Sequence, residues 1–152
     1  MKTKMKTIIG LAAKIDQSQA RLKEGFLEMM GKINAALAGQ AITAIDKKIE
    51  FPIESWENED NLLQKVTLNL NIGASGIGIS LFIGEQDEEG SWVWNRLNDE
   101  PEFATMKLVI AKIPEIFAFY IAELEKINEI ETEAVSAMEN IIASEFFGGG
   151  SA

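Results

Sequence analysis

The side chains of this sequence that could perform chemistry are carboxylates, lysines, hydroxyl groups and a single tyrosine, because the chain contains neither cysteine nor histidine. Without cysteine there is no disulfide, no thiolate nucleophile and no sulfur-rich metal site. Without histidine there is no Ser-His-Asp or Cys-His catalytic set and no HExxH zinc site. We therefore expect no catalytic residue, no metal site and no cofactor, and we predict that the protein is not an enzyme.

Carboxylates are the remaining groups that could act in pairs. Glu50 and Glu54 are predicted to share the polar face of one strand, and a buried carboxylate pair can perform acid–base chemistry. Solvated charges at the edge of a sheet are the favoured interpretation. The acidic runs 57–60 and 87–89 offer oxygen ligands for Ca²⁺, but neither has the spacing of an EF-hand loop, so we favour solvated turns.

A glycine-rich segment at residues 73–78 superficially suggests a phosphate-binding loop. Its letters, GASGIG, match neither GxGxxG nor GxxxxGK[ST], and a strand rather than a helix is predicted to follow. Ser75 has no histidine to activate it as a nucleophile. The segment is therefore predicted to be a hairpin turn.

Two tryptophans offer the clearest candidate for a binding surface. Trp92 and Trp94 share one face of a predicted strand, and Val93 and Leu97 share the other. If the tryptophans point inward they are core anchors, which is the favoured interpretation because large rings are usually buried. If they point outward, they form an exposed aromatic surface, and such surfaces usually mark binding sites. The residues of that candidate surface are Phe82, Trp92, Trp94 and Arg96.

Three groups of elements must position these residues, and the first is helical. Apolar or small side chains recur in steps of three and four from residue 5 to residue 36, with Gln19 filling one position, which predicts a long amphipathic helix. Gly25, Gly31 and Gly39 each weaken a helix by about 1 kcal/mol relative to alanine, so two helices with a break near Gly39 or Asp16 are the alternative. The positions are Met5, Ile8, Ala12, Ile15, Leu22, Phe26, Met29, Ile33 and Ala36.

The second group is a set of strands. Between residues 48 and 97, four runs in which apolar and polar residues alternate are separated by turn-forming residues, which predicts a four-stranded antiparallel meander. Pro52 suits an edge strand, because proline cannot donate a hydrogen bond to a neighbouring strand. The uncharged run 66–84 has the 19 residues of a membrane span, but its apolar residues alternate, and we expect strands.

The third group is again helical, with apolar residues at helical spacing up to Ile141. Asp99 and Glu102 have the spacing of a capping box, and Pro101 suits the first turn of a helix. Pro114 is expected to kink or split the helix, because proline removes a backbone donor and clashes with the preceding turn.

This order of elements predicts an α+β fold with the helices on one face of the sheet. We expect a single domain over residues 1–147. It comprises a helical arm of one helix or two (1–47), a β-meander (48–97) and a helical region (99–147), and a flexible tail follows at 148–152.

Charge is divided unequally along the chain. Residues 1–48 contain nine Lys or Arg and four Asp or Glu, whereas residues 49–152 contain five and twenty, so the net charges are +5 and −15. A basic and an acidic helix can pair through complementary fields, while their apolar positions supply most of the energy. Glu125, Glu129 and Glu133 are the candidate interaction residues of the acidic helix.

We predict a non-enzymatic protein–protein interaction or adaptor module that self-associates through amphipathic helices as a homo-oligomer. Two alternatives stay open: an acidic inhibitor that mimics nucleic acid and occupies a basic protein, and a sensor that binds a small ligand on the outer sheet face. We expect no direct binding of nucleic acid, which an acidic face repels. The apolar run 8–13 is shorter than the core of a secretory signal, so we expect a soluble, cytoplasmic protein that does not associate with membranes.

Overall fold

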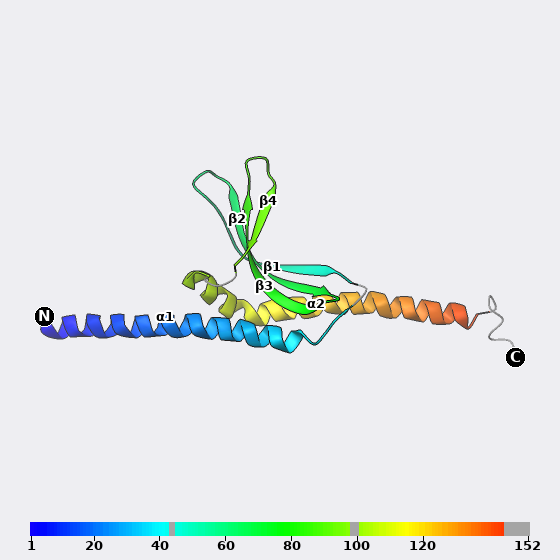
Figure 1. Cartoon of the computed structure of the whole chain (residues 1–152), viewed down its shortest axis with the longest axis horizontal. Helices are drawn as coiled ribbons and strands as arrows, with labels where there is room; N and C mark the ends of the chain where they lie inside the picture. The colour runs from blue at the N-terminus through cyan, green and yellow to red at the C-terminus, as the bar shows by residue number, and fades with distance from the viewer. Residues whose placement is uncertain (43–44, 98–100, 145–152) are drawn as a thin grey trace. The chain divides into compact units, whose positions relative to one another are not determined.

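The computed structural model describes residues 1–42, 45–97 and 101–144 (Figure 1). Its elements follow the predicted order of helix, antiparallel sheet and helix, so the α+β class is confirmed. They are α1 (Lys2–Leu37), β1 (Lys47–Glu57), β2 (Leu63–Gly73), β3 (Gly76–Gln86), β4 (Trp92–Arg96) and α2 (Phe103–Ile142). The chain divides into two compact units, Met1–Pro114 and Glu115–Ala152. The predicted cap at Asp99 and the predicted tail 148–152 lie outside the described residues.

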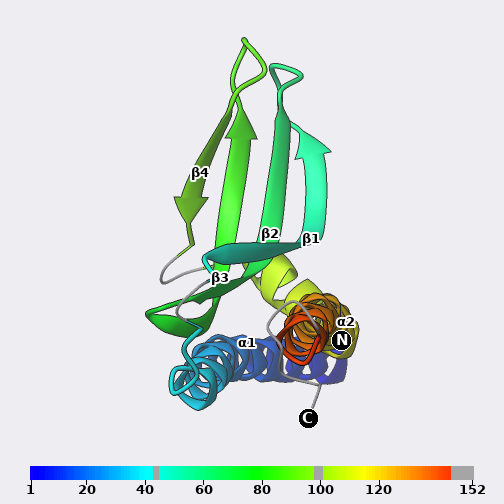
Figure 2. The same ribbon diagram turned by 90° about the vertical axis from the view of Figure 1, so that its right-hand side faces the viewer.

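The sheet is the predicted meander, with strand order β1-β2-β3-β4 and every neighbouring pair antiparallel (Figure 2). The glycine-rich segment forms the hairpin between β2 and β3, where Gly73 pairs with Gly76. Gly76 has φ +114°, and a Cβ atom there would lie 3.0 Å from the carbonyl oxygen of Ala38. Only glycine adopts this conformation without strain, so the hairpin interpretation of the glycines is confirmed.

The core of the first unit lies on one face of the sheet. Alternate residues of β1, β2 and β3 point to this apolar face because the side-chain period of a strand is two. Their burial removes apolar surface from water and supplies the main stabilisation of the unit. The buried apolar strand residues are Ile49, Phe51, Ile53, Val66, Leu68, Leu70, Ile72, Ile79 and Leu81, and the helices of the same unit add Phe26, Met106 and Val109.

An irregularity in β1 changes which side chains share a face. The pairing of β1 with β2 shifts between Pro52 and Glu54, and such a bulge lets two residues oppose one on the partner strand. Glu50 pairs with Asn69, whereas Glu54 pairs with Val66 and accepts a hydrogen bond from the Thr105 hydroxyl of α2 at 3.2 Å. The prediction that Glu50 and Glu54 lie on the same face is therefore wrong.

Helix α1 is a single helix that continues through Gly25 and Gly31, so the predicted alternative of two helices is wrong. It ends at Leu37, ten residues before β1 begins, and the helical arm is shorter than the predicted 1–47. The residue that follows, Ala38, still donates its backbone N–H to the carbonyl of Asn34 and caps the helix. Phe26 is the buried residue of α1, at 4% exposure.

One side chain of α1 forms hydrogen bonds with the backbone of β3. The Asn34 amide accepts a hydrogen bond from Ile79 N–H at 2.6 Å and donates one to Ile79 C=O at 3.1 Å. In the part of the chain that the structure describes, β4 pairs with β3 at residues 82–86, and Leu97 N–H bonds to Leu81 C=O. At Ile79, Asn34 supplies the bonds that a strand neighbour would make. The amide thereby sets both the position and the rotation of α1 on the sheet.

Helix α2 is not split at Pro114, because its helical segment continues to Ile142. Proline lacks the N–H that would bond to the preceding turn, and Pro114 is also the last residue of the first unit. Within that unit, Lys112 Nζ donates to the carbonyl of Ile53 at 3.4 Å. Among the described residues, neither helix has a window apolar enough to cross a lipid bilayer.

Candidate functional site

The second face of the sheet, called the polar face below, carries hydrophilic side chains in register on three strands. Glu50 of β1, Asn69 of β2 and Ser80 of β3 lie opposite one another, and Thr67 faces Phe82 in the next row. Asn69 is fully buried at 0% exposure, and Thr67 and Ser80 are buried as well. The centre of the polar face, which we expected to be exposed to water, is therefore buried.

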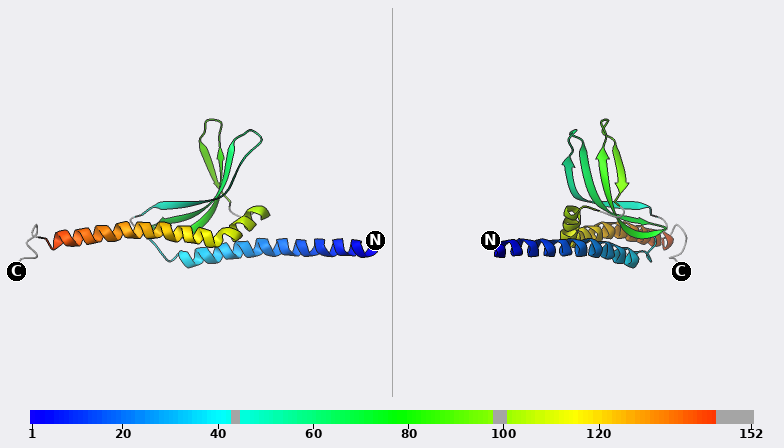
Figure 3. Two further views of the ribbon diagram at one scale, coloured as in Figure 1. Left: turned by 180° about the vertical axis from the view of Figure 1, so that it is seen from behind. Right: turned by 60° about the vertical axis from the view of Figure 1, so that its left-hand side comes forward.

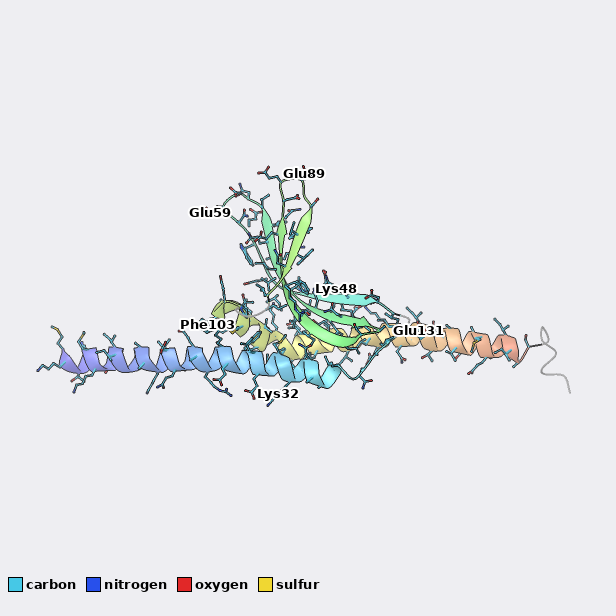
Figure 4. All side chains as sticks on the ribbon, viewed as in Figure 1. Lys32, Lys48, Glu59, Glu89, Phe103 and Glu131 are labelled. Atoms are coloured by element: carbon cyan, nitrogen blue, oxygen red, sulfur yellow. The ribbon has the colours of Figure 1, made fainter. Side chains whose placement is uncertain are left out.

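One contact between side chains crosses the centre of the polar face. The Nζ atom of Lys48 lies 5.1 Å from the centroid of the Phe82 ring, within the range of a cation–π contact. Lys48 belongs to β1 and Phe82 to β3, so their contact crosses β2 diagonally over Asn69. Lys48 is also 3.8 Å from the Glu50 carboxylate, and it is labelled on the sheet in Figure 4.

The atoms beneath this contact lack partners. Neither the Asn69 amide oxygen, nor its nitrogen, nor the Thr67 hydroxyl has a hydrogen-bond partner among the described residues. A buried polar group without a partner costs about 1–3 kcal/mol of stability. The neighbouring Asn71 instead donates to the Ser80 hydroxyl at 3.3 Å. With two such atoms, Asn69 is the polar residue of the sheet that we expect to lower the stability most.

The variant Asn69→Leu is expected to raise the free energy of unfolding by about 1–2 kcal/mol, because it removes two unpartnered polar atoms at similar volume. Urea titration followed by tryptophan fluorescence measures the change. Asn71→Leu is the matched control and should give no gain, because it breaks an existing hydrogen bond. A loss of stability in Asn69→Leu would show that the amide is satisfied in solution.

The two tryptophans lie on the polar face but are neither core anchors nor a free platform. Both are half-buried, and their rings stack with centroids 5.6 Å apart at 22°. The Trp94 ring covers Gly84, where a Cβ atom would come within 2.5 Å of it, and Lys65 Nζ lies 4.6 Å from the centroid of the Trp92 ring. Val93, on the other face, is 55% exposed.

The candidate aromatic residues do come together on one face. Phe82 pairs with Arg96 across the strands, in the same series as the pair Gly84 and Trp94. Arg96 is exposed. The two tryptophan rings contact each other, and they also contact Gly84 and Lys65. Part of the ring surface that could bind a ligand is therefore covered by the protein itself.

The acidic turns use their side chains to hold their own backbones. The Asn58 side-chain oxygen accepts hydrogen bonds from the N–H groups of Asp60 and Leu62, and a carboxylate oxygen of Asp87 does the same for Glu89 and Ser91. Glu59 and Glu89 stand at the tips of the two turns, away from α1 (Figure 4). Among the described residues, no three acidic side chains are grouped to hold a metal ion.

Tyr120, in the second unit, is 3% exposed. Burial raises the pKa of its phenol group above the ordinary value, so the group stays protonated at physiological pH.

Helix α1 presents an uncovered apolar surface. Every residue from 1 to 18 is exposed, and the first half of α1 continues past the end of the sheet in both views of Figure 3. The apolar residues here follow the same helix face that buries Phe26 further along. This surface, the α1 stripe, consists of Met5, Ile8, Ile9, Leu11 and Ile15, each more than half exposed.

A hollow of about 250 Å³ lies at the inner end of the α1 stripe. Leu11, Ile15 and Leu22 form its apolar lining, and Lys14 and Lys107 contribute basic groups. Helix surfaces pack by placing the side chains of one helix into hollows of another. The hollow therefore has the shape and lining to accept an apolar side chain, and the sequence alone did not indicate it, because Lys107 comes from α2.

The last part of α2, residues 128–142, is the second uncovered helix surface and is called the α2 end. Each of its residues is exposed. It contains four glutamates and neither Lys nor Arg. The predicted interaction residues Glu129 and Glu133 lie on its polar side, as does Glu125 just before it. Its exposed large apolar residues are Ile130, Val135, Met138, Ile141 and Ile142.

A comparison of this chain with protein-family models, curated proteins and solved structures finds no match.

Proposed function

We propose that this protein is an interaction module that self-associates through the α1 stripe. The observation that carries the proposal is the continuity of one helix face. The face that buries Phe26 continues through Ile15 and Ile8, which are 58% and 60% exposed. One half of the face is covered by the sheet of the same unit, and the other half has the same chemistry without a cover.

Helix stability also supports this proposal. Most helices in proteins are stabilised by packing of an apolar face rather than by helix propensity alone. Residues 2–18 have no buried side chain, and Gly10 within them weakens the helix further. Covering the α1 stripe would stabilise this segment, since each buried Ile, Leu or Met side chain contributes about 1.5–3 kcal/mol.

The double variant Ile8→Glu/Ile15→Glu is expected to weaken self-association by about 100-fold, because two apolar contacts worth about 1.5 kcal/mol each are lost. Sedimentation velocity over a range of protein concentrations measures the dissociation constant. The matched control is Thr3→Glu/Gln17→Glu, which introduces the same charge on the side of the helix away from Ile8 and Ile15 and should retain most of the association. A wild-type protein that stays monomeric at all concentrations would contradict the proposal.

A further inference from the structure

We infer that the α1 stripe of one copy binds the α2 end of a second copy. This inference rests on the proposed self-association and specifies which surfaces meet. Two uncovered amphipathic helix segments are present on one chain, and they differ in charge. Each copy would therefore carry one basic and one acidic surface, and each surface would bind the opposite surface of another copy.

The basic partner is the first half of α1. Residues 2–18 contain four lysines and one aspartate. Lys4 precedes Leu11 by seven residues and so lies on the same helix face. Lys14 lines the hollow beside Leu11 and Ile15, with Lys107 nearby. Lysine side chains thus flank the apolar residues that a partner helix would cover.

The acidic partner is the α2 end. Ile130 and Ile141 are 65% and 52% exposed. Glu131 lies seven residues before Met138, and Glu139 lies three before Ile142, so both carboxylates lie beside the apolar residues. Glu129 and Glu133 fall on the other side of the helix. The α2 end therefore matches the basic segment in pattern and opposes it in charge.

Charge and length favour this pairing over the others. Pairing of two α1 stripes would bring lysines together, and pairing of two α2 ends would bring glutamates together. Both are disfavoured because like charges at an interface oppose association. An anionic membrane could bind the basic segment but would leave the α2 end uncovered. At 1.5 Å per residue the two segments are about 25 and 22 Å long, so each can cover the other.

The pairing joins two different surfaces. An interface of this kind, repeated by identical copies, produces a closed ring or an open chain rather than a simple two-fold dimer. The flanking ion pairs are exposed to solvent, so they are screened by salt. Association is therefore expected to weaken as the salt concentration rises.

Charge reversal tests the inference. The α1 variant Lys4→Glu/Lys14→Glu and the α2 variant Glu131→Lys/Glu139→Lys are each expected to weaken self-association by about tenfold or more, because each places like charges beside the apolar contact. An equimolar mixture of the two variants should recover mixed complexes. The chain that carries all four substitutions should recover self-association to within about threefold of the wild type, as measured by sedimentation velocity.

A second α2 variant separates helix pairing from recognition of the acidic face as a whole. Glu129→Lys/Glu133→Lys changes the net charge by the same amount on the opposite side of the helix. A smaller loss of association than in Glu131→Lys/Glu139→Lys supports the inference. An equal or larger loss overturns it and favours the acidic-face alternative, in which a basic protein is bound.

The remaining outcomes separate this inference from the proposed function. If the wild type associates and only the α1 variants weaken it, self-association stands but the α2 end is not the partner, and the inference is overturned. If the substitutions change stability but the wild type is a monomer, the function and the inference both fail. Binding of the monomer to vesicles with anionic lipids, lost in Lys4→Glu/Lys14→Glu, also overturns both in favour of a membrane.

Discussion

Replacing Phe26 with alanine is expected to lower the free energy of unfolding of the first unit by about 3–5 kcal/mol, the range for a buried phenylalanine. Phe26 is the buried residue of α1. It lines a cleft of about 110 Å³ with Met30, Asn34, Leu81 and Leu97. Removal of the ring leaves a cavity that the paired strands beneath cannot collapse to fill. The loss is large against a typical total stability of about 5–15 kcal/mol.

Urea titration of Phe26→Ala followed by two signals measures this effect. Tryptophan fluorescence reports the sheet, because Trp56, Trp92 and Trp94 all lie in strands, and circular dichroism at 222 nm reports the helices. Leu27→Ala is the matched control. Its side chain is adjacent but 42% exposed, so a loss of no more than about 1 kcal/mol is expected. Equal losses in the two variants would show that Phe26 does not anchor the helix.

Replacing Asn34 with alanine is expected to cost about 2–4 kcal/mol, because the backbone N–H and C=O of Ile79 both lose their hydrogen bonds. Each backbone group left unsatisfied in a buried setting costs about 1–3 kcal/mol. The shorter of the two bonds, at 2.6 Å, has the amide oxygen as acceptor. Stability and helix content are both expected to fall, because the same side chain holds α1 on β3.

A graded series tests whether the amide itself is required at position 34. Asn34→Asp keeps an acceptor for Ile79 N–H but places a second oxygen against Ile79 C=O, so its stability is expected to be well below that of the wild type. Hydrogen exchange at the Ile79 amide is the direct measurement, and protection should decrease in both variants. Full protection of this amide in Asn34→Ala would show that another group bonds to Ile79.

Much of the fold was predictable because local patterns carry it. The period of two in residues 66–72 and 77–83 specifies which strand residues share the apolar face, and the turn at Gly73–Gly76 specifies the hairpin. The bulge after Pro52 was not predictable in this way. A shift in register depends on how two strands pair, and the alternation of residues 48–54 is unbroken across the position of the bulge. The length of α1 was misjudged because residues 38–46 carry no strong turn signal other than Gly39.

The candidate sites were also predictable only where a local sequence pattern indicates them. The apolar spacing of Met5, Ile8 and Ile15 was visible in the sequence, but spacing cannot show that the sheet ends before the helix does. The burial of Asn69 was also missed. The contact that crosses β2 there joins Lys48 and Phe82, which are 34 residues apart in the chain, and the sequence contains no local signal for it.

The amide of Asn34 has a consequence for aggregation. A strand with unpaired N–H and C=O groups is a template for strands of other molecules, which is how edge strands seed fibrils. Beyond the end of β4, Ile79 would present such groups next to the apolar Ile77 and Leu81. Asn34 occupies them, and on the opposite edge Pro52 and the bulge interrupt β1. The sheet therefore offers few free backbone groups to strands of other copies, which leaves the helices as the surfaces for the self-association proposed above.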